Sequence, residues 1–97
     1  MPLRFCFKST FQRAFDNLPA EKQRLVLKAL EAPAHYFQSG QAPYGLRIKK
    51  LYARGPQKTF EARIGIDLRL VWVQTEEETI FALLGGHDEV QRFLKNL

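Results

Sequence analysis

The chain has 97 residues, of which 45% are hydrophobic and 26% are charged. This length and balance predict one folded domain over residues 1–97 and argue against a disordered chain or a multidomain protein. Fifteen Lys and Arg residues against ten Asp and Glu residues give a net charge of +5, which favours partners that are acidic.

The single cysteine, Cys6, cannot form an intramolecular disulfide and has no second cysteine with which to build a zinc or iron–sulfur site. The N-terminal segment lacks the apolar run of a signal peptide, and nowhere do about 18 apolar residues follow one another. No phosphate-binding loop, dinucleotide fingerprint or metal signature is present. We therefore expect a cytoplasmic protein that has no membrane segment, no metal ion and no small-molecule cofactor.

The first third of the chain predicts one strand and two helices. Residues 3–8 alternate apolar and polar side chains, as in a strand with one covered face, and the apolar set is Leu3, Phe5 and Phe7. Residues 9–18 predict a helix that opens with Ser and Thr, two good N-cap types. Residues 19–32 predict a second helix, which Pro33 ends. Its apolar stripe comprises Leu25, Val26, Ala29 and Leu30.

The rest of the chain predicts a sheet and a closing helix. After a loop rich in Pro and Gly, residues 45–53 predict a strand with a basic side and a bulge between Lys49 and Lys50. Three further strands are predicted at residues 59–65, 68–74 and 79–85, and a helix with Asp88 as its N-cap follows. The predicted fold class is α+β: a small, twisted, mainly antiparallel sheet of four to five strands, with an N-terminal helical hairpin packed on one face and a short C-terminal helix.

The hairpin over residues 60–73 has a predictable register. A turn around residues 65–67 places apolar residues opposite one another on one face: Phe60 with Trp72, Ala62 with Leu70, and Ile64 with Leu68. The same register sets Arg63 opposite Arg69 on the other face and places Glu61 opposite Val71. Like charges directly across a sheet are unfavourable. Either Glu61 and neighbouring acids neutralise the arginines, or a bound anion does.

Two functional interpretations of these residues have plain structural alternatives. A concave face that carries Arg63, Arg69 and either Lys49 or Lys50 would suit a nucleic-acid backbone, because the arginine fork matches phosphate geometry. The alternative is a solvated face with ordinary salt bridges. His87, directly before the last helix, could transfer protons in phosphodiester chemistry, or could merely help to cap that helix.

The order of the elements and four stretches of sequence resemble the RelE/ParE superfamily of toxins from bacterial type II toxin–antitoxin systems. The stretches are "FQRAFDNLPAEKQRLVLKALE", similar to the helical hairpin of that superfamily, "GLRIKKL", its basic strand, "FEARIGIDLRLVW", its core hairpin, and "ALLGGHDEVQRF", its closing segment. Together they cover most of the chain. The resemblance implies a RelE-like fold and a metal-independent, ribosome-dependent mRNA endoribonuclease that inhibits translation. It implies a cognate antitoxin, the ribosome and messenger RNA as partners.

The resemblance also assigns roles to residues. Arg63 and Arg69 match arginines of the two core strands and would bind phosphate and stabilise the transition state. Glu61 is a candidate general base, and His87 is a candidate general acid or base. The predicted RNA and phosphate contacts of the basic strand come from Arg47, Lys49 and Lys50.

One departure from the family keeps other functions open. Gln91 stands where many members carry a tyrosine that contributes to cleavage, and glutamine cannot act as an acid or base. A ParE-like toxin that inhibits DNA gyrase shares the fold, as would a degenerate toxin that binds only its antitoxin. A bare RNA-binding domain fits less well, because Phe60 and Trp72 are predicted on the buried face rather than exposed for base stacking.

Overall fold

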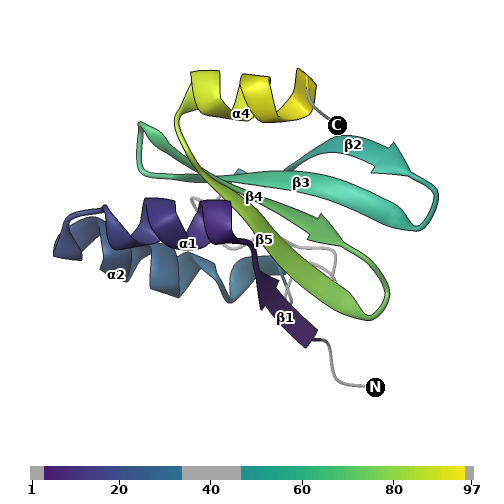
Figure 1. Cartoon of the computed structure of the whole chain (residues 1–97), viewed down its shortest axis with the longest axis horizontal. Coiled ribbons are helices and arrows are strands. Elements are labelled where there is room, and N and C mark those ends of the chain that lie inside the picture. Colours follow the sequence, from purple (N-terminus) through teal and green to yellow (C-terminus); the bar gives the residue numbers. More distant parts are fainter. Residues whose placement is uncertain (1–3, 34–46, 96–97) are drawn as a thin grey trace.

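A computed structural model describes residues 4–33 and 47–95, and the structural statements below concern those residues. Figure 1 shows the helices and strands along the chain. In chain order they are β1 (Arg4–Phe7), α1 (Ser9–Asp16), α2 (Ala20–Ala29), β2 (Lys49–Arg54), β3 (Gln57–Ile64), β4 (Leu68–Gln74), β5 (Glu78–Gly85) and α4 (His87–Lys95).

The strands form one five-stranded sheet in the order β1-β5-β4-β3-β2. All neighbouring strands are antiparallel except β1 and β5, which run parallel at one edge. The helices α1 and α2 lie side by side on one side of the sheet, and α4 lies on the other side (Figure 1). The predicted α+β class, with its mainly antiparallel sheet, helical hairpin and closing helix, is confirmed.

The main core lies between the helical hairpin and the sheet. The three predicted apolar pairs of the β3–β4 hairpin are confirmed, and the rings of Phe60 and Trp72 stack with their centroids 5.5 Å apart. Side chains of the size of Phe, Leu and Ile contribute about 1.5 to 3 kcal/mol each when fully buried. The buried cluster comprises Phe11, Val26, Ala29, Phe60, Ala62, Ile64, Leu68, Leu70, Trp72, Phe81 and Leu84.

A second apolar contact anchors α4. Val71 and Val90 are almost completely buried, yet neither belongs to the main cluster. Val71 alternates with Leu70 and Trp72 along β4, so its side chain points away from the hairpin of helices. Because α4 contacts β4 and β5, it covers Val71 on this second side of the sheet.

Two predictions of covered apolar faces were only partly right. Phe5 and Phe7 of β1 are 49% and 48% exposed, because β1 is an edge strand and the helices cover the middle of the sheet. Their rings contact Phe81, with centroids 6.2 and 5.1 Å away, and the ring of Phe7 also lies 5.5 Å from that of Phe11 in α1. On α2, Val26 and Ala29 are buried but Leu25 is 49% exposed, so the buried stripe is narrower than predicted.

The boundaries differ from the predictions by a few residues. The helix α2 ends at Ala29, before the predicted stop at Pro33. The bulge in β2 lies between Lys50 and Tyr52, one residue beyond the predicted place. The helix α4 begins at His87, so Asp88 lies in its first turn rather than at the N-cap position. No helix among residues 4–33 and 47–95 is long and apolar enough to cross a membrane.

Candidate nucleic-acid interface

Four charged side chains belong to the sheet face that lies opposite the helical hairpin. In the register of β2 with β3, Lys49 is paired with Glu61, and in the register of β3 with β4, Arg63 is paired with Arg69. Directly paired residues of neighbouring strands point to the same face of a sheet. These four residues therefore form one cross-strand cluster, which we call the charged cluster.

The charged cluster contains a partly buried ion pair. Arg69 Nη1 donates a hydrogen bond of 2.9 Å to Glu61 Oε1. The side chain of Glu61 is 6% exposed and that of Arg69 is 21% exposed. Charges so withdrawn from water are retained only with a partner of opposite sign. Of the two predicted ways to neutralise the facing arginines, the acidic neighbour is the one present for Arg69.

Arg63 differs from Arg69 in its surroundings. Its side chain is exposed, and within the described ranges it makes no ion pair or hydrogen bond. Its guanidinium is therefore available in this structure to an anion approaching from solvent, and it lies across the ladder from Arg69.

The two neighbouring lysines of β2 point to opposite faces. Lys49 shares a face with the charged cluster, whereas Lys50 is paired with Phe60 and points to the side of the main core. There Lys50 lines a hollow of about 630 Å³, together with Lys58 and others. The structure therefore does not bring Lys50 together with the arginines. Arg47 is exposed and precedes β2, so no strand pairing fixes its direction.

His87 lies close to the charged cluster along the sheet. Arg69 is paired with Gly85, the last residue of β5, and His87 follows two residues later as the first residue of α4. The imidazole is exposed. Gln91, also exposed, lies one helical turn further and so on the same side of α4 as His87.

Glu89 is a residue of this region that the sequence prediction missed. Its Oε1 accepts a hydrogen bond of 3.3 Å from the backbone N–H of Gly86, which caps the start of α4. Its carboxylate also lies over Gly85: a Cβ at that position would come within 2.6 Å of Glu89 Oε2. The sequence did contain a signal for this cap. Glu89 stands three residues after Gly86, which is the spacing of the glutamate and the N-cap residue in a capping box.

The turn between β3 and β4 is tied to the helical hairpin. Lys22 Nζ of α2 lies 2.8 and 2.9 Å from the two carboxylate oxygens of Asp67. The hydrogen bond and charge of Lys22 lower the pKa of Asp67 below its ordinary value of 3.8. This contact links α2 to the turn that precedes β4, the strand that carries Arg69.

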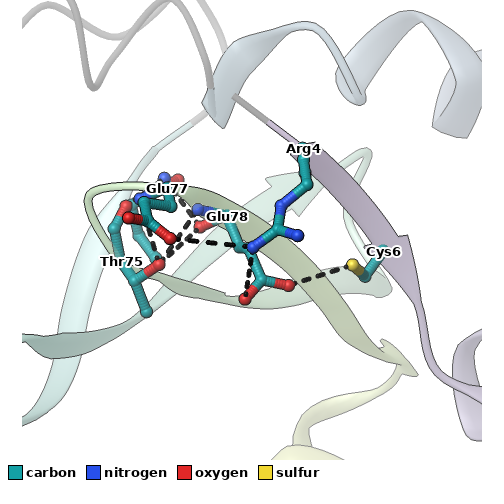
Figure 2. Close-up of polar contacts among 6 residues, drawn as sticks. Arg4, Cys6, Thr75, Glu77 and Glu78 are labelled. Atoms are coloured by element: carbon teal, nitrogen blue, oxygen red, sulfur yellow. Dashed lines mark hydrogen bonds and ion pairs between the residues drawn. The ribbon is translucent and has the colours of Figure 1, made fainter. Parts of the chain in front are cut away.

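Away from the charged cluster, a second set of polar side chains on β1 and β5 interact with one another (Figure 2). Cys6 Sγ donates a hydrogen bond of 3.2 Å to Glu78 Oε2, and Arg4 lies 3.6 Å from the other oxygen of Glu78. The hydrogen bond to Glu78, together with burial and the negative charge, raises the pKa of the Cys6 thiol above 9.0. The thiol is therefore protonated at neutral pH and is a poor nucleophile.

Among the residues that the structure describes, no three His, Cys, Asp or Glu side chains are grouped so that they could hold a metal ion.

No protein-family model matches the sequence, and no curated protein matches it closely. Solved structures do match the fold. A chain of the archaeal RelE–RelB complex from Pyrococcus horikoshii has a TM-score of 0.69 and 18% identity, over 89% of this chain and 96% of that one. A chain of the RelB–RelE antitoxin–toxin complex from Methanococcus jannaschii has a TM-score of 0.63 and 16% identity, over 91% and 96%. The YoeB dimer from Staphylococcus aureus has a TM-score of 0.65 and 14% identity, over 90% and 99%.

These matches extend over nearly the full length of each chain, which fits a single domain of the same architecture. The matched chains are 14–18% identical to this chain, so the likeness is one of fold. Together with the order of the elements and the strand register, it identifies the architecture: the chain has the RelE-like fold.

Proposed function

We propose that this protein is the toxin component of a type II toxin–antitoxin system and that it cleaves messenger RNA on the ribosome. The observation that carries the proposal is the facing pair Arg63 and Arg69, which share one sheet face on a RelE-like fold beside the helix that begins with His87. Facing arginines repel each other; Glu61 already pairs with Arg69, and an RNA phosphate would compensate the charge of the exposed Arg63 while also meeting the free donors of Arg69.

The proposed reaction is attack by the ribose 2′-hydroxyl on the adjacent phosphate, which leaves a cyclic phosphate and a free 5′-hydroxyl. The guanidinium groups of Arg63 and Arg69 stabilise the charge that develops on the phosphate oxygens. Lys49, on the same face, binds a neighbouring phosphate and orients the RNA. His87 takes the proton of the 2′-hydroxyl and delivers one to the leaving 5′-oxygen, because an imidazole can both accept and donate a proton and this one is exposed at the start of α4.

The glutamine at position 91 supports the proposal that His87 carries the proton transfer. Gln91 lies one turn after His87 and is exposed, so its amide can hydrogen-bond to the RNA but cannot donate or accept a proton in the reaction. This arrangement fits a nuclease that uses a histidine where other members rely on a tyrosine.

The proposed partners are a cognate antitoxin, the ribosome and messenger RNA, and the proposed location is the cytoplasm. Two of the solved structures with this fold are complexes of RelE with RelB, and one of them is described as an antitoxin–toxin complex. An antitoxin segment rich in Asp and Glu would complement the charged cluster and the net charge of +5.

Primer extension on a defined message in a reconstituted translation system tests the proposal. We expect new 5′ ends within codons when both ribosomes and the purified protein are present, and none when ribosomes are left out. The variant with both Arg69→Ala and His87→Ala should produce no such ends while remaining folded. An intact message at high protein concentration would contradict the proposal, and a gyrase supercoiling assay would then test the ParE-like alternative.

A further inference from the structure

Glu61 is poorly placed for the role of general base that the family resemblance suggests. A general base has to come within roughly 3 Å of the group whose proton it takes. The side chain of Glu61 is 6% exposed, and its Oε1 already accepts a hydrogen bond from Arg69 at 2.9 Å. An RNA hydroxyl could reach this carboxylate only if Arg69 left it.

The position of Glu61 suits a different task. Arg63 faces Arg69 across the ladder, and Glu61 precedes Arg63 by two residues on the same side of β3. Without the carboxylate, the guanidinium of Arg69 would turn away from that of Arg63, because like charges across a sheet repel each other. The attraction of Glu61 holds Arg69 on the shared face.

The ion pair leaves most of the arginine fork unused. A guanidinium has five N–H donors, and the bond to Glu61 uses one on Nη1. The side chain of Arg69 is 21% exposed, so the remaining donors can meet a ligand at the surface of the face. An arginine held at one end and open at the other resembles a preorganised phosphate clamp.

From this geometry we infer that Glu61 is a positioning residue, which orients Arg69 toward the RNA phosphate and does not exchange protons with the substrate. The identity of the ligand rests on the proposed function, whereas the ordering of Arg69 by Glu61 is a property of the folded chain. The two parts therefore have separate tests.

The first test needs no activity. The guanidinium ¹⁵N–¹H resonances of Arg69 are recorded in the ¹⁵N-labelled chain, assigned with Arg69→Lys, and compared with those of Glu61→Gln and Glu61→Ala. In the parent, we expect the Arg69 guanidinium to rotate slowly and its hydrogens to exchange slowly with water. This protection should be partly lost in Glu61→Gln and fully lost in Glu61→Ala.

Glu78→Gln is the matched control, because Glu78 pairs with Arg4 away from the charged cluster and its loss should leave the Arg69 resonances unchanged. Glu61→Gln keeps the shape of the side chain, so it supplies the answer if Glu61→Ala fails to fold. Arg69 resonances that average freely in the parent, or that neither variant changes, would overturn the inference.

The second test separates positioning from proton transfer. Single-turnover cleavage of ribosome-bound message is measured against pH for the same variants. We expect Glu61→Gln to keep about a tenth of the parent rate or more with an unchanged acidic limb, and Glu61→Ala to lose about 100-fold, as when one oriented charge donor is removed. The variant with both Glu61→Ala and Arg69→Ala should be no slower than Arg69→Ala, because the two residues act as a unit.

A Glu61→Gln rate as low as that of Glu61→Ala, with loss of the acidic limb of the pH profile, would make Glu61 the base and refute the inference. A parent chain that leaves the message intact would refute the proposed function, and the resonances of Arg69 would still decide the role of Glu61.

Discussion

Arg63 and Arg69 face each other across the β3–β4 ladder. Of these two arginines, only Arg69 has a carboxylate partner among the described residues. The pair is therefore unequal: one guanidinium is fixed and partly withdrawn from water, and the other is exposed. A phosphate that binds between them would meet the guanidinium of Arg69, which is already in place, and that of Arg63, which has to move toward it.

This inequality predicts that the two arginines contribute unequally to stability. Arg69→Ala leaves the carboxylate of Glu61 buried without its partner, which should lower the free energy of unfolding by about 2 kcal/mol, below the full cost for a completely buried pair. Arg63→Ala removes an exposed charge and should change the free energy of unfolding by less than about 0.5 kcal/mol. Urea unfolding measures both. Equal destabilisation by the two variants would show that the ion pair contributes nothing specific.

The two lysines of β2 supply a matched pair for RNA binding. Lys49→Ala should weaken binding and lower the slope of log affinity against log salt by about 1, because one phosphate contact is lost. Lys50→Ala should leave both quantities unchanged, since Lys50 points to the other side of the sheet. Binding is measured by fluorescence anisotropy with a labelled single-stranded RNA at several salt concentrations. A larger effect of Lys50→Ala would mean that the RNA binds at the hollow beside β2.

The two glycines before α4 should respond differently to alanine. Gly85→Ala forces the carboxylate of Glu89 to move, so the bond to the N–H of Gly86 is lost and the protein should be destabilised by about 0.5 to 1 kcal/mol, as for other lost helix caps. Gly86→Ala meets only the carbonyl oxygen of Asp67 at 3.8 Å, an ordinary contact, and serves as the control. Combining Gly85→Ala with Glu89→Ala should cost little more than Glu89→Ala alone. Additive losses in thermal unfolding would count against this explanation.

The thiol of Cys6 should react slowly with iodoacetamide at neutral pH. Its pKa is raised above 9.0 mainly by the hydrogen bond to Glu78, so the reactive thiolate forms only at higher pH. Glu78→Gln removes the negative charge and should move the midpoint of the rate against pH downward. Mass spectrometry of the alkylated chain follows the rate. A midpoint that is the same in both proteins would rule out Glu78 as the cause.

The contact between Lys22 and Asp67 should make part of the stability sensitive to acid. Because the folded-state pKa of Asp67 lies below 3.8, the pair stabilises the protein above that pH and loses its effect as the pH falls through the lowered pKa. Asp67→Asn should therefore show a shallower loss of stability in the acid range than the parent. Urea unfolding between about pH 2 and pH 6 measures the two slopes. Parallel curves would exclude a contribution from this carboxylate.

The hairpin register could be predicted because its apolar side chains specify it redundantly. Three alternate pairs, from Phe60 with Trp72 to Ile64 with Leu68, share one face, and a shift by one residue would turn the apolar set of one strand to the other face. The facing arginines followed from the same register. Their neutralisation did not follow, since a sequence cannot distinguish a carboxylate of the chain from a bound anion.

The edges of the fold were harder to predict than its centre. Alternation along β1 indicated a covered face, but whether the helices extend as far as that edge depends on tertiary packing, and Phe5 and Phe7 remain half exposed. The faces to which Lys49 and Lys50 point depend on the position of a bulge. This bulge lies one residue further along the chain than predicted. Glu89 was missed because its cap depends on the path of the backbone through Gly86.

The pairing of β1 with β5 sets the order in which the protein can be completed during synthesis. Cys6 and Glu78, which are joined by a hydrogen bond, are separated by 72 positions. Among the described strands, β1 is therefore synthesised first but cannot pair until β5, the last of them, has been made, and α4 with His87 follows later still. A nascent chain has both arginines before it has the histidine. The proposed site can thus be assembled only after α4 has been synthesised.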